Sequence, residues 1–201
     1  MQFATFAYSI FEQSVSDYHK RNDINAEIKN PYPVKSIEYY LYMKNWIDTV
    51  QWHLEDIIRD PNINPVKALE VKRRIDSSNQ ERTDLVELID SYFYEKYQSV
   101  VYSKNAAFNT ESPAWAIDRL SILALKIYHW QQEILREEVN EKHRNTCREK
   151  LTVLSEQQQD LSLAIDQLLT DIEAGKKYMK VYKQMKMYND PELNPVLYGN
   201  K

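Results

Sequence analysis

The chain has 201 residues, a formal net charge of −4 and an unusually large number of aromatic residues, with fifteen Tyr and four Trp. Its length is sufficient to bury a core as one domain over residues 1–201 without a disulfide or metal staple. The acidic balance argues against general nucleic-acid binding, which draws on an excess of Lys and Arg. Since only two glycines occur, the glycine-rich phosphate loops of P-loop and dinucleotide-binding folds are excluded.

The sequence also indicates where the protein resides. Cys147 is the only cysteine, so no disulfide or cysteine-based metal site forms within one chain, which favours a reducing compartment. The first twenty residues contain Glu12 and Asp17 and lack the basic start and apolar run of a signal peptide. No stretch approaches the roughly 18 apolar residues that span a bilayer. We therefore expect a cytoplasmic protein without membrane contact.

Helical periodicity predicts the first two elements. The first helix covers residues 1–19, and an Asn- and Pro-rich loop follows over residues 22–33. The second helix begins near Ser36 and ends by Asp60, because Pro61 disfavours helical geometry in the residue before it. Steps of three and four residues define an apolar face, which we expect to point inward, and a separate polar face. The apolar face holds Trp46, Val50, His53 and Ile57. The polar face holds Asp48, Gln51, Glu55 and Arg59.

The third and fourth predicted helices both begin with a proline, which suits the first helical position. Pro65 opens the third helix, which extends to about Val101. Ser112 caps the fourth helix, Pro113 begins it, and it extends to about Asn140. Most of the fourth helix is apolar nearly all round, which is typical of a helix enclosed by its neighbours.

A heptad repeat marks the fifth predicted helix. Its apolar seam alternates steps of four and three residues, so a helix of this chain or of another chain must lie along it. The seam consists of Cys147, Leu151, Leu154, Gln158, Leu161, Ile165, Leu168 and Ile172. Gly175 either ends this helix or is tolerated within it. Residues 176–188 form a basic amphipathic segment at helical spacing, and the tail from about residue 190 is expected to be extended.

These elements predict an all-α, up-and-down bundle of five or six helices. Three polar runs interrupt its inward faces. In the first, His53 and Asp56 share a helix face and are candidate catalytic residues, although a core histidine bonded to a neighbouring group explains the same pattern. In the second, Asn79 and Arg82 are candidate ligand-binding residues, because a buried guanidinium needs either a carboxylate partner or an anionic ligand.

The third polar run lies on the fourth helix. Asp118 and His129 are further catalytic candidates, and Arg119 and Lys126 are further ligand-binding candidates, with Ser121 between them. We expect the three runs to meet at the centre of the bundle. They form either an ion-pair network closed within the chain, which is the preferred interpretation, or a polar cleft for a small anionic ligand.

No metal site or other cofactor is predicted. The chain contains no Glu-x-x-His pair, which di-iron helical bundles use for metal binding. Glu87-x-x-Asp90 matches half of the acidic pattern of all-helical, magnesium-dependent nucleotide pyrophosphatases. The Glu-x-x-Glu that should precede it is absent, and we retain that enzyme class only as a minor alternative.

Four segments of the chain resemble a bacterial helical domain family of unknown function. They read WHLEDIIRDP, IDSSNQERTDLVELID, DRLSILALKIYHW and KMYNDPELNP. The resemblance covers about residues 46–198 and implies a bacterial, cytoplasmic, helical protein without an assigned activity. Because the family has no established catalytic residues, the resemblance assigns no role to any residue here.

Two functional hypotheses follow from the sequence. The heptad seam and the aromatic content favour a structural or protein-interaction role, with a homo-oligomer or a helical protein as partner. The alternative is an enzyme or binder of a small anionic, phosphorylated ligand that uses the polar cluster at the bundle centre. Neither hypothesis involves nucleic acid or a membrane.

Overall fold

The computed structural model describes residues 2–185, 187 and 190–199. Within these residues the chain forms six helices and one pair of two-residue strands, so the predicted all-α fold is confirmed. No helix in this part of the chain combines the length and the apolar character needed to cross a membrane. The elements in chain order are α1 (Phe3–His19), α2 (Ile37–Ile58), α3 (Pro65–Tyr97), β1 (Ala107–Phe108), α4 (Pro113–Leu135), α5 (Glu141–Glu173), β2 (Lys177–Tyr178) and α6 (Pro195–Tyr198).

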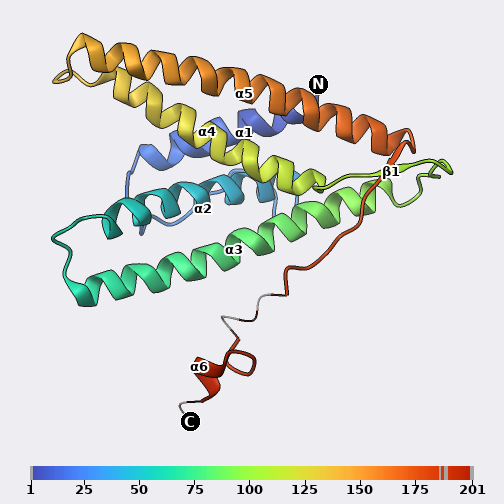
Figure 1. Ribbon diagram of the computed structural model, residues 1–201, viewed down its shortest axis with the longest axis horizontal. Coiled ribbons are helices and arrows are strands. Elements are labelled where there is room, and N and C mark those ends of the chain that lie inside the picture. Colours follow the sequence, from blue (N-terminus) through green and yellow to red (C-terminus); the bar gives the residue numbers. More distant parts are fainter. Residues whose placement is uncertain (1, 186, 188–189, 200–201) are drawn as a thin grey trace.

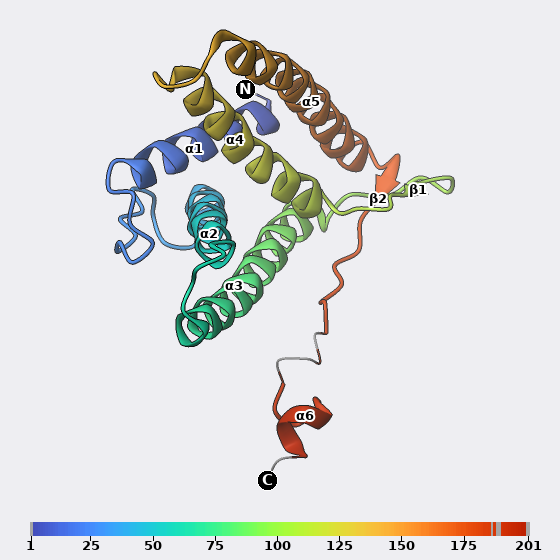
Figure 2. The same ribbon diagram turned by 60° about the vertical axis from the view of Figure 1, so that its left-hand side comes forward.

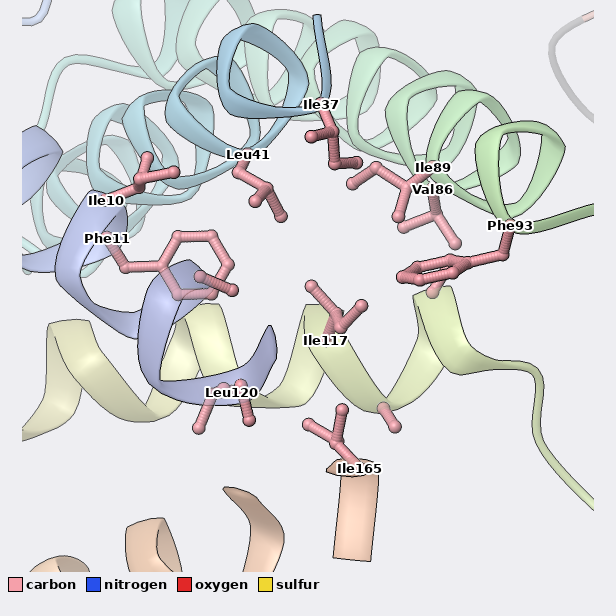
Figure 3. Packing of buried hydrophobic residues seen from close by; sticks show 14 of the residues in the cluster. Ile10, Phe11, Ile37, Leu41, Val86, Ile89, Phe93, Ile117, Leu120 and Ile165 are labelled. Atoms are coloured by element: carbon pink, nitrogen blue, oxygen red, sulfur yellow. The ribbon is translucent and has the colours of Figure 1, made fainter. Parts of the chain in front are cut away.

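Helix α4 lies at the centre of the bundle, as its apolar character on all sides predicts. It contacts α1, α2, α3 and α5, and Figures 1 and 2 show it between the α2–α3 pair and α5. Side chains from these helices meet around it in the main apolar core (Figure 3). The labelled core residues are Ile10, Phe11, Ile37, Leu41, Val86, Ile89, Phe93, Ile117, Leu120 and Ile165.

The heptad seam of α5 finds its partner within the same chain. Helices α4 and α5 run side by side (Figure 1), and their contact is the most extensive between any two described elements. The seam residues Ile165, Leu168 and Ile172 are buried in the core. Packing within the chain therefore covers the C-terminal part of the seam, whereas Leu151, Leu154 and Leu161 stay half-buried.

Two helix ends differ from the prediction. Helix α3 ends at Tyr97, four residues before Val101, and α4 ends at Leu135 because Arg136 adopts an extended backbone with φ −62° and ψ 129°. Asn140 does not close α4. Instead, its side chain accepts a 2.9 Å hydrogen bond from the backbone N–H of His143 and so caps the start of α5.

The predicted helical spacing over residues 176–188 is wrong for the described part of that segment. Gly175 has a φ of +68°, and the backbone N–H groups of Gly175 and Lys176 donate to Ile172 and Asp171 at 3.0 and 2.9 Å. This Schellman arrangement ends α5. The chain then forms the parallel pair β1–β2, in which Ala107 donates to the carbonyl of Lys176. Lys186 and Tyr188, which the prediction included, lie outside the described residues.

Replacement of Gly175 should show how strongly this turn depends on glycine. A Cβ atom at residue 175 would stand 2.5 Å from the carbonyl oxygen of Val101, in addition to the strain of a positive φ. We expect Gly175→Ala to lower the free energy of unfolding by at least about 1–2 kcal/mol, the usual cost of this backbone region. Chemical denaturation measures the loss.

Gly175→Asn is the matched comparison, because Asn adopts positive φ more readily than Ala but carries the same Cβ. If the close approach of the Cβ atom to Val101 causes the destabilisation, Gly175→Asn should lower the free energy of unfolding nearly as much as Gly175→Ala. Full recovery with Asn would show that the backbone angle alone matters.

The C-terminal segment extends away from the bundle, with α6 at its end (Figures 1 and 2). Gln184 contacts the bundle, because its backbone N–H donates a 3.0 Å hydrogen bond to Glu87 Oε1 on α3. The predicted extended tail is interrupted by α6. The side chain of Asn194 caps this helix by accepting a 3.0 Å hydrogen bond from the backbone N–H of Val196. Pro195 occupies the first helical position, as prolines do at the start of helices.

Candidate functional site

A charged cluster of Lys44, Asp48, Arg82 and Asp118 joins α2, α3 and α4. Lys44 Nζ lies 2.5 Å from Asp48 Oδ2 and 2.6 Å from Asp118 Oδ1. The Nε of Arg82 donates to Asp48 Oδ1 at 2.6 Å, and its Nη2 lies 3.4 Å from Asp118 Oδ1. The cluster holds two cations and two anions, so it is neutral without any other group.

Neutral polar side chains complete the surroundings of the charged cluster. Ser121 Oγ donates to Asp48 Oδ2 at 2.7 Å, and Asn45 Nδ2 donates to Ser121 Oγ at 3.1 Å. On the α3 side, Asn79 Oδ1 accepts from Gln51 Nε2 at 2.9 Å and from Arg82 Nη1 at 3.5 Å. These bonds offset the cost of removing the charges from water, which a buried ion pair alone often fails to do.

The cluster is closed at one end and open at the other. The side chain of Lys44 is 0% exposed, whereas that of Arg82 is 22% exposed and lines two hollows. The larger one, here called the Trp52 cleft, has a volume of about 410 Å³. It is lined by Asp48, Gln51, Trp52, Glu55, Asp56, Arg59, Arg82, Ile122 and Leu125. The smaller hollow, about 240 Å³, lies beside Asn79, Asp118 and Gln184.

Three of the candidates lie away from the charged cluster. Asp56 is at the rim of the Trp52 cleft, where its carboxylate faces Arg59 at 3.9 Å and is well exposed. Arg119 is exposed and pairs with Glu111 at 2.5 Å. Arg119 and Lys126 line a separate hollow of about 570 Å³ between α4 and α5, here called the α4–α5 cleft. The three polar runs therefore do not meet in one constellation.

The two histidine candidates form a second cluster with a residue from α1. His19, His53 and His129 are half-buried, and one ring nitrogen of each lies within 4.8 Å of those of the other two. Burial lowers the pKa of all three imidazoles, and that of His129 falls to about 4 because the other two rings add to the effect. All three rings are therefore neutral near pH 7. Neutral imidazoles offer a nitrogen lone pair for a proton or a metal ion.

Sequence reasoning missed Lys44, Asp48 and His19 as site residues. The helical spacing predicts Asp48 on the polar face of α2, but α2 is contacted by α1, α3 and α4, so this face is partly buried as well. The available signal was the four-residue spacing of Lys44 and Asp48, which matches a helical ion pair. His19 lies at the end of α1, and only the packing of α1 brings it to His53 and His129.

Comparison with known proteins identifies the family of this chain. No curated protein and no solved structure matches the chain. A family model does match residues 38–181, from the first turn of α2 to just beyond β2, which includes the whole charged cluster but not His19. Since the match covers more than half of the chain, the protein belongs to the family described as protein of unknown function (DUF4254).

Proposed function

We propose that the protein binds a small ligand with an anionic group in the Trp52 cleft. The observation that carries the proposal is the position of Arg82. The carboxylates of Asp48 and Asp118 contact its guanidinium on the buried side. The Arg82 side chain is nevertheless 22% exposed and lines the Trp52 cleft. A cation whose orientation is fixed by surrounding groups loses little entropy when it binds a ligand.

The walls of the Trp52 cleft suit a ligand that is partly apolar. Trp52, Ile122 and Leu125 supply an apolar surface, and the volume lies within the range of roughly 300–1,000 Å³ typical of small-molecule sites. Trp52 stacks on His129 with ring centroids 4.6 Å apart and an interplanar angle of 8°. This contact holds the indole ring in place as one wall of the cleft.

Acidic residues at the rim restrict where the anionic group of a ligand binds. The carboxylates of Glu55 and Asp56 lie 3.3 and 3.9 Å from Arg59, so these three exposed side chains together carry a net charge of −1 at the rim and repel an anion. Asp48 already accepts from Lys44, Arg82 and Ser121. The remaining attraction for an anion comes from the exposed part of Arg82, and the folded state does not need the ligand because the charged cluster is neutral.

A thermal-shift screen of phosphorylated metabolites and nucleotide sugars tests this function. We expect at least one compound to raise the Tm of the wild-type protein, since a ligand that binds only the folded state stabilises it. Arg82→Gln should abolish the rise. Because that substitution also removes a member of the charged cluster, Trp52→Ala serves as a second variant, which removes an apolar wall of the Trp52 cleft without changing a charge.

Lys126→Gln is the matched control. It removes a cation from the α4–α5 cleft and leaves the Trp52 cleft unchanged. The control should therefore keep the full ligand-induced rise in Tm. A rise that depends on Lys126 instead of Arg82 would place the ligand elsewhere, and a panel without any Arg82-dependent rise would contradict the proposal.

Self-association, the other hypothesis from the sequence, draws less support from the heptad seam than its sequence pattern suggests. Helix α5, which carries the seam, packs along α4 of the same chain, and Ile165, Leu168 and Ile172 are buried in its core. Homo-oligomer formation stays a prediction, which light scattering over a dilution series addresses.

A further inference from the structure

Three imidazoles from three different helices come together at one end of the bundle. His19 ends α1, His53 lies in the last turns of α2, and His129 lies near the end of α4. His19 Nε2 and His53 Nε2 are 3.3 Å apart, and one ring nitrogen of His129 lies within 4.8 Å of those of the other two. Among the residues that the structure describes, this is the one group of His, Cys, Asp or Glu side chains with such spacing.

The hydrogen bonds of the histidine cluster define which nitrogens can bind an ion. His19 Nδ1 lies 2.8 Å from the carbonyl oxygen of Val15, which can only accept, so Nδ1 carries the proton and Nε2 has the lone pair. His53 Nε2 donates to the lone pair of His19 Nε2 at 3.3 Å, and it becomes a metal ligand itself once its proton moves to Nδ1. His129 Nε2 is buried and has no hydrogen-bond partner within the described part of the chain. A buried polar atom without a partner is costly, and a ligand at this position would remove that cost.

The distance between His19 and His53 agrees with that in a tetrahedral metal site, and His129, within 4.8 Å of both, reaches the same geometry after a small shift of its ring. Zn–N bonds of about 2.0–2.1 Å place two ligand nitrogens about 3.3–3.4 Å apart in a tetrahedron. The 3.3 Å between His19 and His53 matches this value. The bond from His19 Nδ1 to Val15 is also the contact that metal-binding histidines usually make with their second nitrogen, which fixes the tautomer and the ring orientation.

Each imidazole is held by its own aromatic ring. Tyr18 stacks on His53, with ring centroids 5.2 Å apart and 12° between the ring planes. The ring centroids of Tyr128 and His19 are 4.2 Å apart. Trp52 stacks on His129. These contacts fix the rings of all three histidines before any ion binds, and they lower the entropic cost of binding.

We propose that His19, His53 and His129 bind one transition-metal ion of the Zn²⁺ class through their ring nitrogens. Imidazole ligands suit Zn²⁺, Ni²⁺ and Cu²⁺, whereas Mg²⁺ and Ca²⁺ require oxygen ligands, which this cluster does not offer. Three protein ligands leave a fourth position for water or for another ligand. The proposal is independent of ligand binding in the Trp52 cleft, because Arg82 is not needed to hold the ion.

Titration of the full-length protein with Zn²⁺ tests the site directly. The protein is prepared without a histidine tag and stripped with a chelator, and binding is followed by isothermal titration calorimetry. We expect one ion per chain. Cobalt(II) in place of Zn²⁺ should give the visible absorption of a tetrahedral complex. His53→Gln and His129→Gln should each weaken Zn²⁺ binding by at least about tenfold, because removing a ligand costs no less than removing a group that merely orients one.

His143 is the remaining histidine of the chain and provides the matched control. It lies on α5, where its Nε2 is 3.3 Å from Glu133 Oε2, and it takes no part in the histidine cluster. His143→Gln should bind Zn²⁺ like the wild type. Circular dichroism shows whether each variant is folded. The His19→Gln variant removes the third proposed metal ligand and gives an independent test.

Two results would overturn the proposal. One is the absence of Zn²⁺ and Co²⁺ binding to the folded wild-type protein, which would identify the cluster as an aromatic packing site of neutral histidines. The other is binding that His53→Gln and His129→Gln leave unchanged or that His143→Gln abolishes. Because the readout is metal binding, failure here leaves the Arg82-dependent ligand screen unaffected.

Discussion

Lys44→Met is expected to lower the free energy of unfolding by about 3–5 kcal/mol, the usual cost of removing one partner from a buried ion pair. The ammonium group is 0% exposed and contacts two carboxylates, Asp48 and Asp118. Its removal leaves Arg82 as the only cation beside both of them. Urea denaturation followed by circular dichroism measures the loss.

A double-substitution cycle separates the charge effect from the loss of packing. Asp48→Asn alone leaves Lys44 and Arg82 with one carboxylate between them, so it should also destabilise the protein. The double variant Lys44→Met, Asp48→Asn keeps one cation and one anion, Arg82 and Asp118, which lie 3.4 Å apart. We expect it to cost about 1–3 kcal/mol less than the sum of the single variants, as for residues in direct contact. Strict additivity would contradict the charge-balance argument.

Lys72 and Asp76 provide a control with the same four-residue spacing. They form an ion pair on α3, but the two side chains are 55% and 43% exposed. Lys72→Met and Asp76→Asn should each change the free energy of unfolding by no more than about 0.5 kcal/mol, since exposed helical pairs contribute little. A large loss in this pair would mean that the effect at Lys44 is not a consequence of burial.

The second large effect is expected at Phe93, where truncation to Ala should cost about 3–5 kcal/mol. This ring is 0% exposed and projects from α3 into the core cluster that also contains Ile117 of α4 (Figure 3). Phe3 of α1 packs against it edge to face, with ring centroids 5.1 Å apart. The substitution would therefore leave a cavity at the contact of three helices. Equilibrium unfolding in urea provides the measurement.

Tyr94 is the matched control for Phe93, because it is the next residue on the same helix and also carries a six-membered ring. Its side chain points away from the core and is 55% exposed. We expect Tyr94→Ala to cost less than about 1 kcal/mol, mainly through helix propensity and partial contacts. Equal losses at both positions would show that the register of α3 differs from the one described.

The histidine and charged clusters illustrate how far local sequence patterns reach. The spacing of Arg82 within an apolar stripe predicts that its guanidinium needs a carboxylate partner or a ligand, and Asp48 and Asp118 meet that need. The same reasoning placed Asp118 and Arg82 together but could not separate them from Arg119 and Lys126. Residues on one helix share spacing rules, yet the neighbouring helices decide which of its faces become buried.

The helical class, the starts of the helices at Pro65 and Pro113, and the apolar seam of α5 can all be read from the sequence, because they depend on residues within a few turns of one another. The packing of the helices, in contrast, is needed to show that α4 is the partner of that seam, that Lys44 is buried, and that His19 joins His53 and His129. These contacts join residues far apart in the chain, and they depend on the angles at which the helices pack.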